Sequence, residues 1–237
     1  MERKEALYEG KAKIIYATDN PNEYLVYYKD DATAGNGAKR GTIVGKGIMN
    51  NKMSAFFFDL LAKEGIAHHY ISMPSDREML VKKLTIIPLE VIIRNVAAGS
   101  LAKRLGLEEG VLMPFPVIEY CYKNDDLGDP MLNRYHIRAM KIATDAELDE
   151  IERMSLKIND ILTEFLKSKK VDLIDFKLEF GRDADGKIIL ADEISPDNCR
   201  FWDSDTKEKL DKDRFRRDLG NVEDAYKEML HRLTGEA

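Results

Sequence analysis

The chain has 237 residues, 44% of them hydrophobic and 34% charged, which supplies enough apolar material for a packed body of two lobes and too much for a disordered protein. Its formal net charge of −6 lacks the basic excess expected of a general nucleic-acid binder. No apolar signal sequence is seen at the start, and no window approaches the roughly 18 apolar residues of a membrane span. We therefore expect a cytoplasmic protein whose partners are small molecules, with no nucleic acid and no membrane.

The first third of the chain is predicted to begin with strands. Runs of aromatic and branched residues, typical of short antiparallel strands, stand at 7–8, 14–16 and 24–28. A polar, glycine-rich loop is expected over 31–47. Apolar residues then recur at helical spacing over 48–64, and Gly65 is a plausible end for that helix.

Helices and strands alternate in the rest of the chain. We expect two strands within 81–93 broken at Pro88 and a short helix at 101–105. A longer helix is expected behind the capping box of Thr144 and Glu147, followed by strands at 173–180 and 188–194 joined by a turn at 182–186. Asn221 is expected to cap a last helix. This mixture predicts an α+β fold of antiparallel sheets and helices. We place the boundary between two lobes near Lys83, with lobes of residues 1–83 and 84–237.

The cysteines and histidines offer no metal motif. Cys121 and Cys199 form no CxxC pair and are interpreted as free thiols of a reducing compartment. His68 and His69 are adjacent, so in a strand they would face opposite ways. We interpret the four histidines as ordinary partly buried or surface residues.

The sharpest chemical feature is the sequence DFKLEFG at 175–181. Side chains alternate along a strand, so Asp175, Lys177 and Glu179 share one face, and the apolar residues between them pack into the core. A charged face of this kind is either a surface ladder of ion pairs or a site that holds a ligand.

The next strand adds acidic residues to this charged face. If the hairpin is symmetric, with Phe180 opposite Lys187, then Asp192 lies opposite Asp175, and the carboxylates surround Lys177. A slip of one residue would bring the following glutamate to that face instead. An oxygen-rich cluster of this kind suits Mg²⁺, which usually takes one or two carboxylates together with phosphate oxygens.

A second feature is the run from Gly10 to Lys13. Lys11 and Lys13 point to the same side beside a glycine, where two ammonium groups and an accessible backbone could cradle phosphates. The alternative is an exposed basic edge strand, in which lysines oppose aggregation. The run is not a Walker loop, because the chain contains no GxxxxGK[ST] sequence.

Two further polar segments could bind a ligand. Gly99 and Ser100 precede a predicted helix and could hold an anion with help from Arg94, although Ser100 could equally be an ordinary helix cap. The run 195–203 follows the acidic strand and contains an arginine and the single tryptophan. It is either a specificity loop or a packed loop.

Taken together, these segments resemble the SAICAR synthetase family. Two stretches, 87–100 and 173–181, match its signatures. The likeness also covers further segments in the family's order: LYEGKAK at 7–13, the segment 31–52, KNDDLGDPMLN at 123–133, and the segments 192–203 and 211–216. The resemblance implies a two-lobe α+β fold similar to ATP-grasp enzymes and distantly to protein kinases, with ATP between the lobes.

The resemblance also implies a reaction. ATP would phosphorylate the carboxylate of carboxyaminoimidazole ribonucleotide (CAIR), and the amine of L-aspartate would then displace phosphate, with Mg²⁺ neutralising the phosphoryl group. Members of the family assemble, which favours a homodimer. The alternative is a small-molecule phosphotransferase on the same scaffold, but such an enzyme would want an HRD-like catalytic loop, and none is present.

Carried over by motif position, the resemblance implies three groups of site residues. ATP would be contacted by Gly10, Lys11, Ala12, Lys13, Val81, Lys82, Lys83, Leu84, Lys177, Glu179 and Asp192, the last two also binding Mg²⁺. CAIR would be contacted by Arg94, Ser100, Asp129, Asp175, Arg200, Lys212 and Arg216. Catalysis would involve Lys177 as a charge stabiliser, with Asp175 and Asp197 orienting the site.

One position departs from the family pattern. Asn36, in the loop 33–37, stands where some members carry aspartate. Because this loop is a candidate for handling the amino substrate, the residues that bind L-aspartate are left unassigned.

Overall fold

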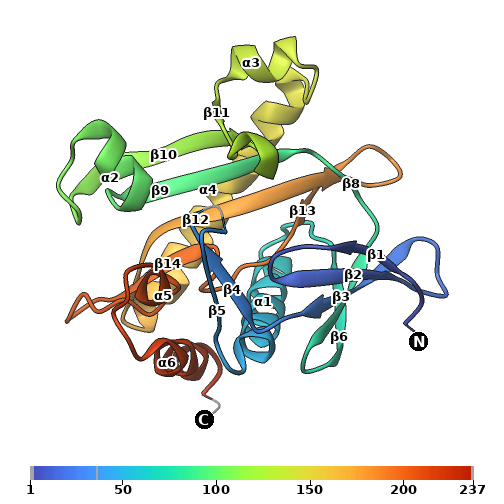
Figure 1. Ribbon diagram of the computed structural model, residues 1–237. Coiled ribbons are helices and arrows are strands. Elements are labelled where there is room, and N and C mark those ends of the chain that lie inside the picture. Colours follow the sequence, from blue (N-terminus) through green and yellow to red (C-terminus); the bar gives the residue numbers. More distant parts are fainter. Residues whose placement is uncertain (1–2, 36, 236–237) are drawn as a thin grey trace.

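A computed structural model describes residues 3–35 and 37–235, and within them the fold is the predicted α+β type with antiparallel sheets (Figure 1). The first sheet of this part of the chain has the strand order β1 (Ala6–Glu9), β2 (Lys13–Ala17), β3 (Glu23–Tyr28), β7 (Glu78–Lys82) and β6 (Tyr70–Ser75). The three strands predicted at its start are confirmed, and they pair antiparallel as expected.

The second sheet is larger and is built around one long strand. Its order is β11 (Met131–Leu132), β10 (Leu112–Tyr122), β9 (Leu89–Val96), β12 (Val171–Arg182) and β13 (Ile188–Ala191), and β8 (Thr85–Ile86) and β14 (Cys199–Asp203) also pair with β12. The apolar residues Phe176, Leu178 and Phe180 of β12 are buried in the core, as their alternation predicts.

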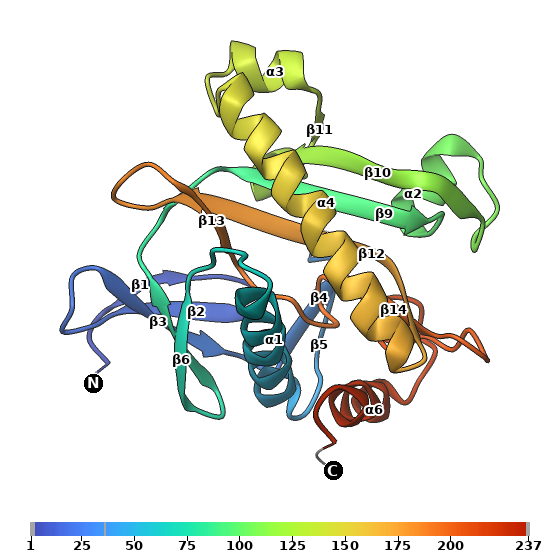
Figure 2. The same ribbon diagram turned by 180° about the vertical axis from the view of Figure 1, so that it is seen from behind.

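The described residues contain six helices, of which α1 packs against the first sheet and α4 against the second. They are α1 (Lys46–Lys63), α2 (Gly99–Leu105), α3 (Arg134–Ala139), α4 (Asp145–Ser168), α5 (Asp213–Arg216) and α6 (Val222–Thr234), with a 3₁₀ turn, η1, at Asp125–Leu127. The long helix α4 crosses the rear face of the second sheet (Figure 2) and buries a stripe of apolar residues there. It begins at the capping box of Thr144 and Glu147 that the sequence predicts.

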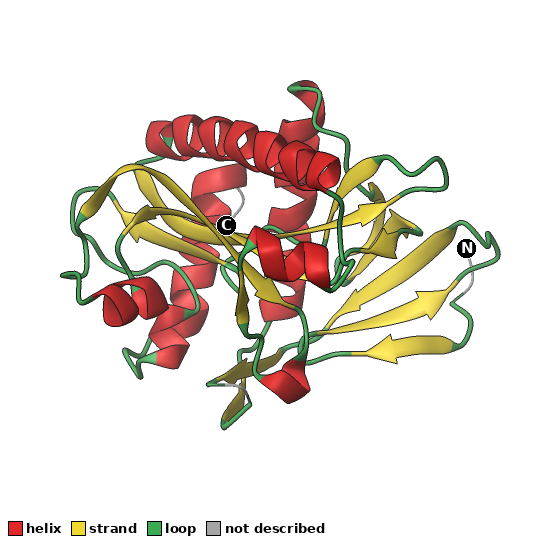
Figure 3. Cartoon of the chain, turned by 90° about the horizontal axis from the view of Figure 1, so that it is seen from above, coloured by secondary structure: helices red, strands yellow, loops and turns green. Residues whose placement is uncertain are grey.

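The two sheets come from different parts of the chain. Every strand of the first sheet precedes residue 83, and every strand of the second follows it. Seen from above, the first sheet projects to one side of the body that α4 covers (Figure 3). Helix α1, however, packs against both the first sheet and α6, so the division into lobes at residue 83 stays a prediction.

Three details differ from the sequence predictions. The expected loop at 31–47 contains a two-stranded hairpin of β4 (Asp31–Ala34) and β5 (Lys39–Thr42). The segment 81–93 falls into three strands, although Pro88 does interrupt them. Asn221 precedes α6 as predicted, but its backbone is left-handed and its side chain makes no capping hydrogen bond.

The predicted register of the β12–β13 hairpin is wrong. Phe180 pairs with Leu190, not with Lys187, because β12 continues to Arg182, which pairs with Ile188, so that only residues 183–187 form the turn. Asp175 consequently has no partner on β13. It pairs with Arg200 of β14 and with Arg94 of β9, and it is therefore not one of the carboxylates around Lys177.

Among residues 3–35 and 37–235, no helix is both long and apolar enough to cross a membrane.

The capping box offers a test of how α4 is held. The Oγ1 of Thr144 accepts from the Glu147 amide at 3.2 Å, and a Glu147 carboxylate oxygen accepts from the Thr144 amide at 2.8 Å. We expect Thr144→Ala to lower the free energy of unfolding by about 1 kcal/mol, because one helix donor loses its partner. Urea unfolding followed by circular dichroism measures this, and an unchanged midpoint would contradict the role of the cap.

Candidate active site

A cavity of about 630 Å³ lies between the two sheets. One part of its wall is apolar and comes from the first sheet and the segment that leaves it, including Ile15, Val26, Val81 and Leu84. The turn from Gly10 to Ala12, between β1 and β2, borders the cavity as well. The opposite wall carries charged residues of β12 and, directly after β13, Asp192 and Glu193.

Lys177 is the centre of the charged wall. Its ammonium lies 2.5 Å from Glu179 Oε1, 3.0 Å from Asp192 Oδ2 and 3.5 Å from Glu90 Oε1. Lys13, on β2 of the other sheet, binds the second oxygen of Asp192. The carboxylate of Asp192 is thus held between lysines of both sheets.

Two groups of this wall, Asp192 and Lys177, are kept charged by their neighbours. Burial alone would raise the pKa of Asp192, but the attraction of Lys13 and Lys177 outweighs it and holds that pKa well below its usual range. Burial likewise opposes the charge of Lys177, yet Asp192, Glu179 and Glu90 raise its pKa well above the ordinary value. Lys177 and Asp192 therefore both stay charged at neutral pH.

A second cavity, of about 420 Å³, adjoins the first. Arg94 lies in its wall with only 4% of its surface exposed, and it donates to three groups. Its Nε lies 2.8 Å from Glu119, its Nη1 lies 2.8 Å from Asp175, and its Nη2 lies 3.0 Å from the Ser100 hydroxyl. Ser100 stands inside the first turn of α2, whose cap is Ala98, so its interpretation as a helix cap is wrong.

Arg200 reaches the same cavity from β14. It donates to Asp175 at 2.8 Å and to Asp213 at 2.8 Å, and it passes close over Gly99. A Cβ on Gly99 would lie 2.3 Å from the Arg200 guanidinium, and the backbone φ there is +51°, so only glycine fits. Lys212 and Arg216, beside and on α5, complete a strongly basic wall.

The two cavities share a wall made of Lys11, Glu90, Lys177, Asp197, Asn198 and Lys212. Asp197 is held there from three parts of the chain. Lys46 of α1 lies 2.7 Å from its Oδ2, Lys212 lies 3.5 Å from the same oxygen, and the Tyr226 hydroxyl of α6 donates to Oδ1 at 2.8 Å. Burial opposes the charge on Asp197, but Lys46 and Lys212 hold its pKa well below the usual range.

The structure brings most predicted site residues to these two cavities. The first is lined by Gly10, Lys11, Ala12, Lys13, Val81, Lys82, Leu84, Lys177, Glu179 and Asp192, and the second by Arg94, Ser100, Asp175, Arg200, Lys212 and Arg216. Lys83 lines neither; its ammonium lies over the Tyr24 ring. Asp129, predicted to contact the ribonucleotide, lines the first cavity instead. Asn36 lies outside the described residues.

Sequence reasoning missed several residues that lie in these walls or directly behind them. Lys46 comes from a stretch predicted to be a polar loop, and no local pattern indicates that it is only 1% exposed. Lys123 binds the second oxygen of Glu179 from the segment after β10. His69, dismissed as an ordinary histidine, is buried in the wall of the first cavity. All three reach the site through long-range packing, which a single segment does not reveal.

Comparison with known proteins places the chain in a family. The family model for SAICAR synthetase matches residues 6–233. The chain belongs to the SAICAR synthetase family. A phosphoribosylaminoimidazole-succinocarboxamide synthase of Caldanaerobacter subterraneus subsp. tengcongensis is 62% identical over 98% of this chain and 99% of the relative.

Solved structures agree with this membership. The crystal structure of phosphoribosylaminoimidazole-succinocarboxamide synthase from Ehrlichia chaffeensis has a TM-score of 0.96 at 49% identity, covering 98% of this chain and 100% of that one. A SAICAR synthetase in complex with ADP has a TM-score of 0.94 at 51% identity, covering 97% of each chain. The α+β fold expected of the family is thereby confirmed.

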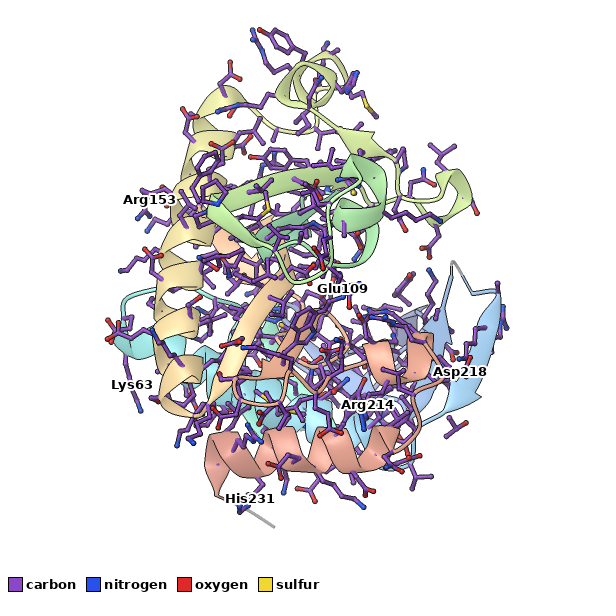
Figure 4. The ribbon with its side chains drawn as sticks, turned by 90° about the vertical axis from the view of Figure 1, so that its left-hand side faces the viewer. Lys63, Glu109, Arg153, Arg214, Asp218 and His231 are labelled. Atoms are coloured by element: carbon purple, nitrogen blue, oxygen red, sulfur yellow. The ribbon has the colours of Figure 1, made fainter. Side chains whose placement is uncertain are left out.

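The Lys46–Asp197 pair can be tested by removing one charge. We expect Lys46→Met to lower the free energy of unfolding by about 3–5 kcal/mol, because a buried carboxylate loses its partner. The double variant Lys46→Met/Asp197→Asn should recover much of that loss. Urea unfolding measures both, with Arg153→Met, on the outer face of α4 (Figure 4), as a control expected to unfold like the parent. Equal urea midpoints for Lys46→Met and the parent would show that the Lys46–Asp197 pair contributes nothing to stability.

Proposed function

We propose that ATP occupies the larger cavity, that CAIR occupies the smaller one, and that a phosphoryl group passes across their shared wall. The chain, as a member of the SAICAR synthetase family with full-length relatives about 60% identical, is an ATP-dependent ligase of purine biosynthesis. It joins L-aspartate to the carboxylate of CAIR, giving SAICAR, ADP and phosphate. The observation that carries the placement is the wall common to both cavities, in which Lys177 and Asp197 stand.

The larger cavity has the two environments that ATP requires. The apolar part near Val81 and Leu84 suits an adenine ring, and Lys82 borders it. The turn of Gly10, Lys11 and Ala12 and the ammonium of Lys13 suit the phosphates. A relative that is 51% identical has been solved with ADP, which supports a nucleotide here.

Glu179 and Asp192 suit Mg²⁺ by their chemistry. Each carboxylate lies in the charged wall, and Mg²⁺ typically takes one or two carboxylates and completes its shell with phosphate oxygens and water. Within residues 3–35 and 37–235, no group of three or more His, Cys, Asp or Glu residues forms a ready-made metal cage. When bound, the ion would neutralise charge on the transferring phosphoryl group.

The smaller cavity suits an anionic ribonucleotide. Arg200, Lys212 and Arg216 supply positive charge, and Arg94 fixes the positions of Ser100 and Asp175 through its three hydrogen bonds. In this placement Asp175 orients Arg200 and Asp197 orients Lys212, so neither acid reacts directly. Asp129, which faces the nucleotide cavity, is proposed to act there instead of on the ribonucleotide.

The reaction then proceeds in two balanced steps. A carboxylate oxygen of CAIR attacks the γ-phosphorus of ATP, the bond to the β-phosphate breaks, and ADP leaves with an acyl phosphate formed. The aspartate nitrogen next attacks the acyl carbon, phosphate departs with its electron pair, and the nitrogen loses a proton. Lys177, at the junction of both cavities, stabilises the charge on the phosphoryl group in transit.

Two finer points stay predictions of the same proposal. The cytoplasm is the expected location, and Cys121 and Cys199 are both free and buried, which suits a reducing compartment. A homodimer is the expected assembly. The binding residues for L-aspartate are not assigned, because Asn36 falls outside the described part of the hairpin loop.

An omission assay separates the ligase from a phosphotransferase. With Mg·ATP, CAIR and L-aspartate, we expect ADP release at full rate only when all three are present. A phosphotransferase would release ADP with CAIR and no amine. Full ADP release without aspartate, with no amide product, would contradict the ligase.

The role of the charged wall is tested by Lys177→Ala and Glu179→Ala. We expect turnover to fall by roughly 100-fold or more in each, because electrostatic stabilisation in transit is lost. Thermal unfolding of the same samples should show folded protein. If activity falls only to the extent that the melting temperature falls, the role of these residues is structural and not catalytic.

The ribonucleotide cavity is tested by Arg94→Ala. Because Arg94 holds Ser100 and Asp175 at that cavity, we expect KM for CAIR to rise far more than KM for ATP. Steady-state kinetics with each substrate varied in turn gives both constants. An unchanged KM for CAIR would refute this placement.

A further inference from the structure

The segment from Ala67 to His69 joins the two sheets beside the charged wall. The His69 amide donates to the Leu190 carbonyl of β13 at 2.9 Å, and the Leu190 amide donates to the Ala67 carbonyl at 3.0 Å. On the other side, the Lys82 amide of β7 donates to the His69 carbonyl at 2.7 Å. The backbone of His69 therefore ties β7 of the first sheet to β13, the strand that leads into Asp192.

The ring of His69 makes a further contact with this strand end. Its Nε2 lies 3.0 Å from the main-chain carbonyl oxygen of Asp192. A carbonyl oxygen can only accept, so Nε2 carries the hydrogen and donates. The side chain is 7% exposed, and Phe58 of α1 packs edge-on against the ring with 5.3 Å between centroids. The donor is thus fixed in place by packing.

Asp192 has an unusual backbone. Its φ is +61°, in the left-handed region that non-glycine residues rarely adopt and that costs roughly 1–2 kcal/mol. A residue keeps such a conformation only where its surroundings hold it, and such residues gather at functional sites. The same residue places its carboxylate between Lys13 and Lys177.

We propose that His69 is a positioning residue for phosphoryl transfer, which holds the left-handed backbone of Asp192 and so directs its carboxylate into the charged wall. This inference rests on the proposed function of Asp192. His69 lines the larger cavity but is not proposed to contact the transferring phosphoryl group. It acts through the Asp192 carbonyl, which would lose its donor if the imidazole were removed.

Variants of matched shape test the proposal. His69→Phe keeps an aromatic ring but removes the donor, whereas His69→Gln keeps an N–H at nearly the same reach. We expect His69→Phe to lower kcat about tenfold or more with little change in KM for CAIR, and His69→Gln to restore most of the rate. His68→Phe is the matched control, because His68 packs against the same Phe58 ring and its Nδ1 is a buried atom without a hydrogen-bond partner in the described structure.

A second readout separates positioning from stability. In a crystal structure of His69→Phe, we expect φ of Asp192 to leave the positive region, and calorimetry should show weaker binding of Mg·ADP with ADP alone less affected. A parental rate in His69→Phe, or a retained positive φ with normal Mg·ADP binding, would overturn the inference. If His69→Phe fails to fold, His69→Ala takes its place. A slow but folded His69→Ala beside a near-parental His69→Gln supports the proposal, and parental rates in both variants overturn it.

Asp192→Asn distinguishes failure of this inference from failure of the proposed function. A fully active Asp192→Asn would show that Asp192 takes no part in phosphoryl transfer. That result would contradict both the role proposed for Asp192 and the positioning role of His69. If Asp192→Asn is inactive and His69→Phe is fully active, the role proposed for Asp192 is supported. Only the positioning role of His69 is then contradicted.

Discussion

The position of the Asp197 carboxylate is the constraint on which the site depends. A buried carboxylate must be paired, and its partners here come from α1, from the residue before α5 and from α6. Lys46 and Tyr226 thereby tie the first and last helices of the body to one point between the sheets. That point is the wall common to both cavities, so the packing that stabilises the fold also fixes how the two proposed substrate sites lie relative to each other.

Strand β12 arranges the chemistry along that wall. Asp175, Lys177 and Glu179 share a face, and successive members are roughly 6–7 Å apart along a strand. Asp175 lines the smaller cavity, Lys177 lines both, and Glu179 lines the larger. One strand thus leads from the cavity proposed for the ribonucleotide to the cavity proposed for ATP, and Lys177, the proposed stabiliser of the transferring group, lies between them. The carboxylates around Lys177 raise its pKa well above the ordinary value, so its ammonium stays charged at neutral pH.

Local sequence patterns predicted what depends on local physics. The alternation of β12, the capping box of Thr144 and the break at Pro88 follow from backbone geometry and are present in the structure. The β12–β13 register failed because turn length, which the sequence leaves open, decides which residues pair. Most residues singled out by the motifs line the two cavities, whereas Lys46 and His69 became visible only through contacts between distant segments.

The central claim is that the carboxylate of CAIR and the γ-phosphate of ATP meet at the shared wall and form an acyl phosphate. Transfer of oxygen tests it most directly. CAIR labelled with ¹⁸O in its carboxylate would be converted with Mg·ATP and L-aspartate, and the released phosphate would be analysed by ³¹P NMR or mass spectrometry. The account predicts one ¹⁸O atom in each phosphate, because the bridging oxygen leaves with phosphorus. Phosphate free of ¹⁸O, formed together with the amide product, would contradict it.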